Sequence, residues 1–207
     1  MVITWHGEGC FKIQNGETSV LLDPPEASSG ITPPRFKTDI LIKSISPWPQ
    51  STDNNQADFS VIGAGEYDFK GVSIKGFSLP KESSEKFFKS VFVIKWDDIT
   101  LGVLGHLSEE LPTQALENME EVDVVIGPVG GTPFVSQDAM LKLVRQINPK
   151  VFIPSFYKID GLKRKTLDIK SFISNFNGDV LKSEEKFVFK KKDLEEIKKT
   201  KIVQLKF

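Results

Sequence analysis

Side chains that could act as nucleophiles or bind transition metals are scarce in this sequence of 207 residues. The chain contains two histidines, His6 and His106, and one cysteine, Cys10. A single cysteine excludes an internal disulfide and a metal cage made of thiolates, and two histidines exclude a site that needs three imidazoles. Cys10 could act as a nucleophile beside His106, but no third residue that would orient the pair is identifiable. A small buried thiol is the commoner role.

Two other features could bind phosphate. The glycine-rich segment 127–131 lacks the Lys-Ser or Lys-Thr pair of a phosphate loop, so it is better explained as close passage of the backbone at a strand end. Residues 1–157 carry 13 basic and 20 acidic side chains, whereas residues 158–207 carry 14 basic and 8 acidic ones. This basic C-terminal part could attract phosphate groups. Lysines outnumber arginines 24 to 3, however, which favours a solvated surface.

The elements that must position these residues are mostly strands in the first half of the chain. Asn15-Gly16 predicts a hairpin between 11–14 and 18–22, because both residues accept the positive φ of such a turn, and Asp97-Asp98 joins a second hairpin. Further strands are expected at 39–45, 59–62, 66–69, 72–77, 122–126 and 151–154. Helices are expected at 112–119, after an N-cap at Ser136, and at 166–176. This order indicates a layered α/β sandwich.

The composition favours a folded, soluble protein. The chain is 39% hydrophobic and contains 16 phenylalanines, which is enough for a sizeable core. No apolar run approaches the about 20 residues that cross a bilayer, and residues 1–10 contain no apolar segment of a signal peptide. We therefore expect one domain over residues 1–207, located in the cytoplasm and without a membrane partner.

Seven short segments, in this order along the chain, resemble the small hydrolase-like, lactonase-like branch of the metallo-β-lactamase superfamily. They are Ile3 to Phe11, Leu21 to Pro24, Asp39 to Ile42, Ile62 to Tyr67 with Gly71 to Ile74, Leu104 to Leu107, Asp123 to Gly131, and Asn148 to Tyr157. The resemblance implies a four-layer αββα sandwich, with two face-to-face β-sheets and helices outside. It also implies a site built from loops at one edge.

Members of that superfamily use one or two zinc-like ions to turn water into a nucleophile. Their central motif, His-x-His-x-Asp-His, follows the third strand. The matching stretch here is Ser-Ile-Ser-Pro-Trp-Pro, residues 44–49, which places Ser44 and Ser46 at the first two histidines. Trp48 then falls on the aspartate and Pro49 on the third histidine, while a shift of one residue offers Ile45, Pro47, Pro49 and Gln50. These side chains are poor metal ligands.

The other ligand positions implied by the resemblance also carry different residues. Glu8 falls on an early histidine, His106 on the metal-bridging aspartate, Phe156 on the last histidine, and Pro80-Lys81 on a His-Asp pair. We therefore expect no catalytic residue, no metal ligand and no cofactor, although the family would use zinc or a similar divalent ion. The expected vestigial cleft consists of Glu8, Asp23, Ser44, Ser46, Trp48, His106 and Phe156.

Three functions remain open from the sequence. The first is a non-catalytic binding or assembly protein that keeps the superfamily's scaffold. The second is a metal-dependent hydrolase of lactones, esters or phosphodiesters, with Glu8, Asp23 and His106 around one metal. The third is binding of a phosphate-rich partner through residues 158–207. The expected partner is a small molecule or a protein, with a homo-oligomer by analogy. Nucleic acid is disfavoured because arginines interleaved with aromatic residues are not evident.

Overall fold

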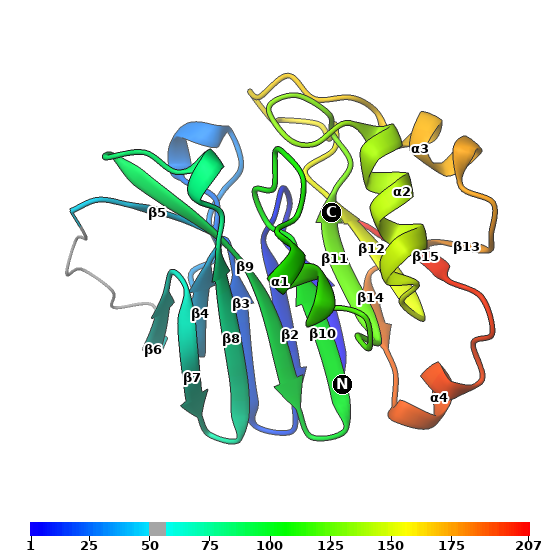
Figure 1. Ribbon diagram of the computed structural model, residues 1–207, viewed down its shortest axis with the longest axis horizontal. Coiled ribbons are helices and arrows are strands. Elements are labelled where there is room, and N and C mark those ends of the chain that lie inside the picture. Colours follow the sequence, from blue (N-terminus) through cyan, green and yellow to red (C-terminus); the bar gives the residue numbers. More distant parts are fainter. Residues whose placement is uncertain (50–56) are drawn as a thin grey trace.

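Two β-sheets packed face to face form the computed structural model of the chain, which describes residues 1–49 and 57–207 (Figure 1). The six-stranded sheet has the order β14-β1-β2-β3-β4-β6. Its strands are β14 (Lys186–Val188), β1 (Val2–Trp5), β2 (Phe11–Asn15), β3 (Thr18–Leu22), β4 (Thr38–Lys43) and β6 (Ala57–Ile62). Pairing is antiparallel from β14 to β3 and parallel from β3 to β6, so this sheet is mixed.

The nine-stranded sheet has the order β13-β15-β12-β11-β10-β9-β8-β7, and β5 pairs with β9 beside this path. Its strands are β13 (Val180–Glu184), β15 (Lys201–Leu205), β12 (Val151–Ser155), β11 (Val124–Pro128), β10 (Ile99–Val103), β9 (Phe87–Trp96), β8 (Val72–Ser78), β7 (Gly65–Phe69) and β5 (Ile45–Pro47). Pairing is parallel from β13 through β10 and antiparallel from β10 to β7.

The main core lies between the two sheets, because alternate residues of each strand point inward. Ile40 and Ile42 of β4 belong to this core, and so do Ile74 of β8 and Ile94 of β9. Leu41, between the two β4 residues, instead joins a small second cluster of buried side chains. The period of two in the sequence thus separates the inner face of the six-stranded sheet from its outer face.

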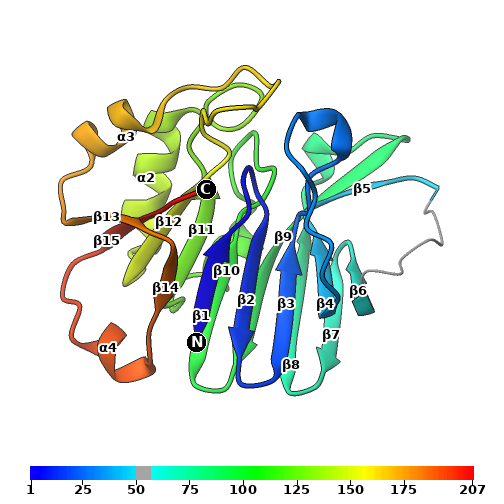
Figure 2. The same ribbon diagram turned by 180° about the vertical axis from the view of Figure 1, so that it is seen from behind.

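Helices cover the two sheets unequally. In Figure 1, α1 (Thr113–Glu117), α2 (Gln137–Ile147) and α3 (Ile169–Asn175) lie in front of the nine-stranded sheet. When the molecule is turned by 180° the six-stranded sheet faces the viewer, with none of these helices over β1–β4 (Figure 2). Its outer cluster of Cys10, Leu21 and Leu41 packs against Phe36 instead. The predicted fold class is confirmed as two mixed sheets with few helices.

Gly127 of β11 lies against tightly packed side chains. A Cβ there would lie 3.0 Å from Leu104 Cδ1 and 3.1 Å from Phe152 Cε2. The remaining helix, α4 (Lys191–Glu195), lies between β14 and β15 in the chain, and there are short 3₁₀ turns, η1 (Ala27–Ser29) and η2 (Pro80–Glu82).

No helix among the described residues combines the length and apolar character needed to span a bilayer.

The predicted elements exist, with shifts at their ends. The first hairpin turns at Gly16-Glu17 and not at Asn15-Gly16, because Asn15 pairs with Thr18 inside the ladder. Only Gly16 takes a positive φ there, at +59°. Ser136 caps α2 as expected by accepting a bond from the Ala139 amide. α3 begins after residue 168 because Asp168 accepts the Lys170 amide.

Strand direction brings distant loops to one end of the sandwich. β3 and β4 run parallel in one sheet, and β10, β11 and β12 run parallel in the other. The carboxyl ends of parallel strands meet at the same edge of a sheet. Asp23, Ser44 and His106 follow the carboxyl ends of β3, β4 and β10, and Phe156 follows that of β12. This end, called the loop end below, carries the candidate site.

Candidate functional site

Asp23, Ser44 and His106 form a continuous hydrogen-bonded chain across the two sheets. Both oxygens of the Asp23 carboxyl lie 2.6 Å from Ser44, Oδ1 from its backbone nitrogen and Oδ2 from its Oγ. Ser44 Oγ also lies 2.8 Å from His106 Nδ1 and accepts the His106 backbone N–H at 3.1 Å. Distances of this size are strong hydrogen bonds. The three side chains therefore act as one polar unit.

The local backbone fixes this unit. Asp23 has a φ of 36°, in the left-handed region, and its amide donates to the Ile42 carbonyl of β4 at 3.0 Å. Ser44 occupies the break between β4 and β5, where the chain crosses from one sheet to the other. Gly105 has a φ of +47°, and a Cβ there would lie 2.1 Å from Ser44 Cβ and Oγ. Only glycine lets the loop before His106 approach Ser44 so closely.

Burial dominates the electrostatics of the unit. It raises the pKa of Asp23 to about 6, although the two bonds from Ser44 oppose this shift. Burial also lowers the pKa of His106 to about 3, assisted by the positive charges of Arg164 and Lys89. Desolvation disfavours the charged form of both groups. A neutral imidazole therefore faces a carboxyl group that titrates unusually close to neutral pH.

Glu8 lies in the loop between β1 and β2 and is almost fully buried. Its φ is 48°, and its carbonyl accepts the Trp5 indole N–H at 3.0 Å and the Phe156 amide at 3.1 Å. The Arg164 Nε lies 3.2 Å from Glu8 Oε1 in an ion pair, although this oxygen has no hydrogen-bond partner among the described residues. Burial raises the pKa of Glu8, and Arg164 opposes that shift.

Aromatic side chains fill the space beside His106. The Phe156 ring lies 4.6 Å from the His106 ring and 4.5 Å from the Phe134 ring, measured between centroids. Phe156 also has a left-handed φ, of 53°. A Cβ on Gly9 would lie 2.2 Å from Phe156 Cζ, so the ring needs a glycine opposite it. Arg164 lies 5.3 Å above the Phe134 ring and covers this group from outside.

The structure thus unites five of the seven expected cleft residues, namely Glu8, Asp23, Ser44, His106 and Phe156. Ser46 is buried in β5, and its Oγ has no hydrogen-bond partner among the described residues. Trp48 is 60% exposed and lies 6.2 Å from the Phe88 ring. Its backbone amide donates to the Lys86 carbonyl at 2.8 Å, just before β9. Gln50 lies outside the described residues.

Other candidates have structural surroundings. Cys10 is completely buried in the outer cluster with Leu21 and Leu41, and burial raises its pKa above the ordinary thiol range. His6 contacts the Phe36 ring at 5.3 Å, and burial lowers its pKa. Pro80 and Lys81 lie in η2, outside the polar unit of Asp23, Ser44 and His106. None of these contacts adds a functional partner to His106.

Sequence reasoning missed the charged group that holds the loop containing His106. Lys89 Nζ contacts the His106 carbonyl at 3.0 Å, Ser108 Oγ at 2.8 Å and Glu82 Oε2 at 3.1 Å. Glu82 also accepts the backbone amides of Ser108 and Glu109. The lysine and glutamate side chains are 13% and 2% exposed. Glu82 and Lys89 lie seven residues apart, but Ser108 reaches them from the loop after β10, so no single local pattern links the three.

The donors present do not fit a resident metal ion. Within residues 1–49 and 57–207, no group of three or more His, Cys, Asp and Glu side chains could hold one. Both Asp23 oxygens and His106 Nδ1 already bond Ser44. Zinc sites need three or four such donors directed at one point.

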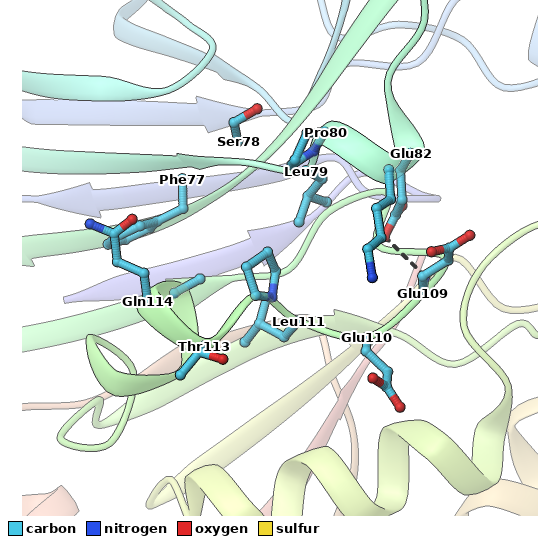
Figure 3. A pocket seen from close by; sticks show the side chains of 13 residues that line it. Phe77, Ser78, Leu79, Pro80, Glu82, Glu109, Glu110, Leu111, Thr113 and Gln114 are labelled. Carbon is cyan, nitrogen blue, oxygen red and sulfur yellow. Dashed lines mark hydrogen bonds between the residues drawn. The ribbon is translucent and has the colours of Figure 1, made fainter.

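Three hollows lie away from the polar unit of Asp23, Ser44 and His106. One of about 470 Å³ opens between the end of β8, η2 and α1, lined by Phe77, Leu79 and Leu111 among others (Figure 3). A second of about 760 Å³ adjoins it through Glu109 and Glu110 and extends along α2. A third, of about 890 Å³, includes Trp5, Tyr157 and Phe207. None of the seven expected cleft residues lines these described hollows.

The sequence matches a family model described as "Beta-lactamase superfamily domain" over residues 2–155. No curated protein matches significantly. Among solved structures, a proposed Zn-dependent hydrolase of the metallo-β-lactamase superfamily from Thermotoga maritima is 24% identical, with a TM-score of 0.79 and 99% of both chains covered. Igni18, a metallo hydrolase from Ignicoccus hospitalis, is 16% identical, with a TM-score of 0.66 and coverage of 91% of this chain and 99% of that one.

The metallo-β-lactamase fold protein YhfI from Bacillus subtilis is 11% identical, with a TM-score of 0.60 over 99% of this chain and 96% of that one. At these identities the structural matches establish the fold alone.

Proposed function

The chain belongs to the β-lactamase superfamily, and from this premise we propose that it is a member without a resident metal ion. It uses the fold for binding or assembly in place of hydrolysis. Relatives of similar fold carry names of metal-dependent hydrolases. The proposal therefore depends on what stands in this chain where their chemistry would need ligands.

The observation that carries the proposal is the internal pairing of the polar side chains. Ser44, at a position that the family resemblance assigns to a histidine ligand, has a hydroxyl that bonds Asp23 at 2.6 Å and His106 at 2.8 Å. If Asp23 and His106 turned away from Ser44 to bind an ion, the buried Ser44 hydroxyl would lose its hydrogen-bond partners. Each unsatisfied buried group costs about 1–3 kcal/mol. The polar unit is thus stable without a metal.

Aromatic and charged side chains pack beside the polar unit. Phe156, at the position that the family resemblance assigns to the last histidine, packs on both His106 and Phe134. Arg164 then pairs with Glu8, the residue at the early histidine position. The Phe156 ring and the ion pair between Glu8 and Arg164 support a closed cleft rather than an open site that activates water. The hollow near α1, at about 470 Å³, has the size of a small-molecule pocket.

The competing function is a metal-dependent hydrolase with Glu8, Asp23 and His106 around one ion. A panel of lactones, esters and phosphodiesters, each with added Zn²⁺, Mn²⁺ or Fe²⁺, decides between the two. We expect no turnover above the metal-only blank, for the wild type and for His106→Ala alike. Turnover by the wild type that His106→Ala abolishes would refute the non-catalytic proposal.

Assembly and nucleic-acid binding have separate tests. A homo-oligomer would appear as a multiple of the 23.2 kDa chain mass in light scattering. Binding to a phosphate-rich polymer would weaken steeply with salt, because counterion release sets that affinity. We expect no such binding, since Lys191 and Lys201 of the basic part already pair with Asp123 and Asp179.

A further inference from the structure

Ser44 Oγ has three polar neighbours and only one proton to offer them. One lone pair accepts the His106 backbone N–H. The remaining lone pair and the hydroxyl proton must serve Asp23 Oδ2 at 2.6 Å and His106 Nδ1 at 2.8 Å. A hydroxyl donates one hydrogen bond and accepts two. Whichever neighbour receives the proton, the other must donate to Ser44.

Two arrangements satisfy this count. If Asp23 is ionised, Ser44 donates to Asp23 and His106 must donate from Nδ1, so its Nε2 carries no proton. If Asp23 is protonated, it donates to Ser44, which then donates to His106 Nδ1, and the imidazole proton must lie on Nε2. From this geometry we propose that Asp23, Ser44 and His106 form a proton relay, in which protonation of the buried carboxyl switches the tautomer of His106.

The proton balance of the switch is simple. A proton arrives at Nε2 of the imidazole, the Nδ1 proton passes to Ser44 Oγ, and the Ser44 proton passes to Asp23 Oδ2. The product is a carboxylic acid, a hydroxyl and a neutral imidazole with its proton on Nε2. One proton enters from solvent, and no other bond is broken. The reverse sequence returns it.

The charged groups around the relay favour tautomer exchange over a charged imidazole. Arg164 and Lys89 face His106 and, with burial, keep its pKa about 3. Around Asp23, Lys43 favours the carboxylate, whereas Glu8 and burial favour the acid. Cys10 is also near Asp23, and its own pKa is raised. His106 thus stays neutral through the range in which Asp23 titrates.

The switch would alter what the site presents to a ligand. The His106 side chain is 14% exposed, and none of the described residues makes a hydrogen bond with its Nε2. This nitrogen accepts a hydrogen bond when Asp23 is ionised and donates one when Asp23 is protonated. A ligand or partner that bonds His106 would therefore bind with a pH dependence set by a carboxyl group it never touches.

Nitrogen NMR of the full chain tests the relay directly. With only two histidines in the sequence, His6→Gln leaves the His106 ring alone in the spectrum. We expect Nδ1 to carry the proton above a midpoint near pH 6 and Nε2 to carry it below. One tautomer throughout pH 4.5 to 8, or an imidazolium ion within that range, would overturn the relay.

Two variants locate the source of the change. Asp23→Asn keeps the shape of the acid, and its amide donates to Ser44, so we expect Nε2–H at every pH. Ser44→Ala breaks the chain, so the tautomer should cease to follow Asp23. If Ser44→Ala does not fold, Asp23→Asn still decides, since a pH-dependent tautomer in that variant contradicts the relay. The readout is independent of whether the protein hydrolyses anything.

Discussion

The two ends of the sandwich use left-handed backbone differently. At the hairpin end, Gly16, Lys70 and Asp97 take positive φ in short turns, and all three are exposed. At the loop end, Glu8, Asp23 and Phe156 take φ of 48°, 36° and 53°, and all three are buried. An exposed turn needs such a conformation to reverse the chain. The buried positions instead place Glu8 beside Arg164, Asp23 beside Ser44 and Phe156 beside His106, at a cost of about 1–2 kcal/mol each in backbone conformation.

The difference teaches that the loop end holds strained backbone at buried positions, where the side chains bond mainly to one another. The hairpin end is set by local turn chemistry, whereas the loop end depends on contacts between segments far apart in sequence. Matched substitutions at the two ends therefore measure how much each kind of contact contributes to the free energy of unfolding.

The largest difference in unfolding free energy between the two ends is expected from two glycine substitutions. Gly105→Ala places a Cβ 2.1 Å from Ser44, whereas Gly71→Ala meets nothing within 4 Å, although both glycines have positive φ. We expect Gly105→Ala to lose about 4 kcal/mol of unfolding free energy and Gly71→Ala about 1 kcal/mol. Urea denaturation measures both. Equal losses would show that the loop end is no more tightly packed than the hairpin end.

Two lysines give the next contrast. Lys89→Met leaves Glu82, whose side chain is 2% exposed, without its cation, whereas Lys70→Met affects an exposed pair with Asp39. We expect a loss of about 3 kcal/mol for Lys89→Met and a much smaller loss for Lys70→Met, because water screens an exposed cation. Thermal unfolding at two salt concentrations checks this, because salt should reduce only the Lys70 effect. A loss below 1 kcal/mol for Lys89→Met would remove its assigned role.

Two serines sharpen the comparison within the loop end. Ser44→Ala leaves the Asp23 carboxyl short of a buried donor, so we expect a loss of about 2 kcal/mol. Ser46→Ala removes a buried hydroxyl that has no partner among the described residues, so its effect on unfolding free energy should be near zero or slightly stabilising. Chemical denaturation of the two variants gives the answer. Equal effects would mean that the polar unit contributes no stability of its own.

The final contrast is a pH dependence, in which two buried groups of the loop end oppose each other. Asp23 has a folded pKa of about 6 against an ordinary 3.8, so its contribution to stability is present below pH 3.8 and is lost as pH rises through 6. His106, lowered from 6.5 to about 3, contributes above pH 6.5 and loses that contribution as pH falls. The two slopes oppose each other between pH 4 and 6, each at most about 1.4 kcal/mol per pH unit.

Asp23→Asn should therefore be more destabilising, relative to the wild type, at pH 4 than at pH 7. Unfolding free energies of the two proteins at four pH values test this prediction. A difference that stays constant, or grows toward pH 7, would mean that Asp23 is not held as an acid in the folded state.

Much of the fold could be predicted because its signals are local. Asp97-Asp98 joins its hairpin as predicted, and Ser136 caps α2. The turn at Gly16-Glu17 was misplaced by one residue, since nothing local shows that the Asn15 amide bonds Asp97 at 2.7 Å. Local sequence patterns predict which helices and strands form, but they predict the end residues of these elements less accurately.

The site was predicted only in part. Asp23, Ser44 and His106 were named from the family resemblance, but their hydrogen bonds join positions 21 and 62 residues apart. Arg164 and Phe134 were not named, because their roles arise from contacts with Glu8 and Phe156 across the fold. Trp48 was also named from the family resemblance; it is 60% exposed and follows β5, whose pairing with β9 has no sequence signal.

The most direct test of the central claim is the metal content of the native protein. Elemental analysis after expression in medium with zinc, iron and manganese, followed by dialysis without chelator, measures it per chain. The account predicts well under 0.1 equivalent of any of these metals, because a retained ion needs donors that Ser44 already holds. One or two equivalents per chain, lost on His106→Ala, would contradict it.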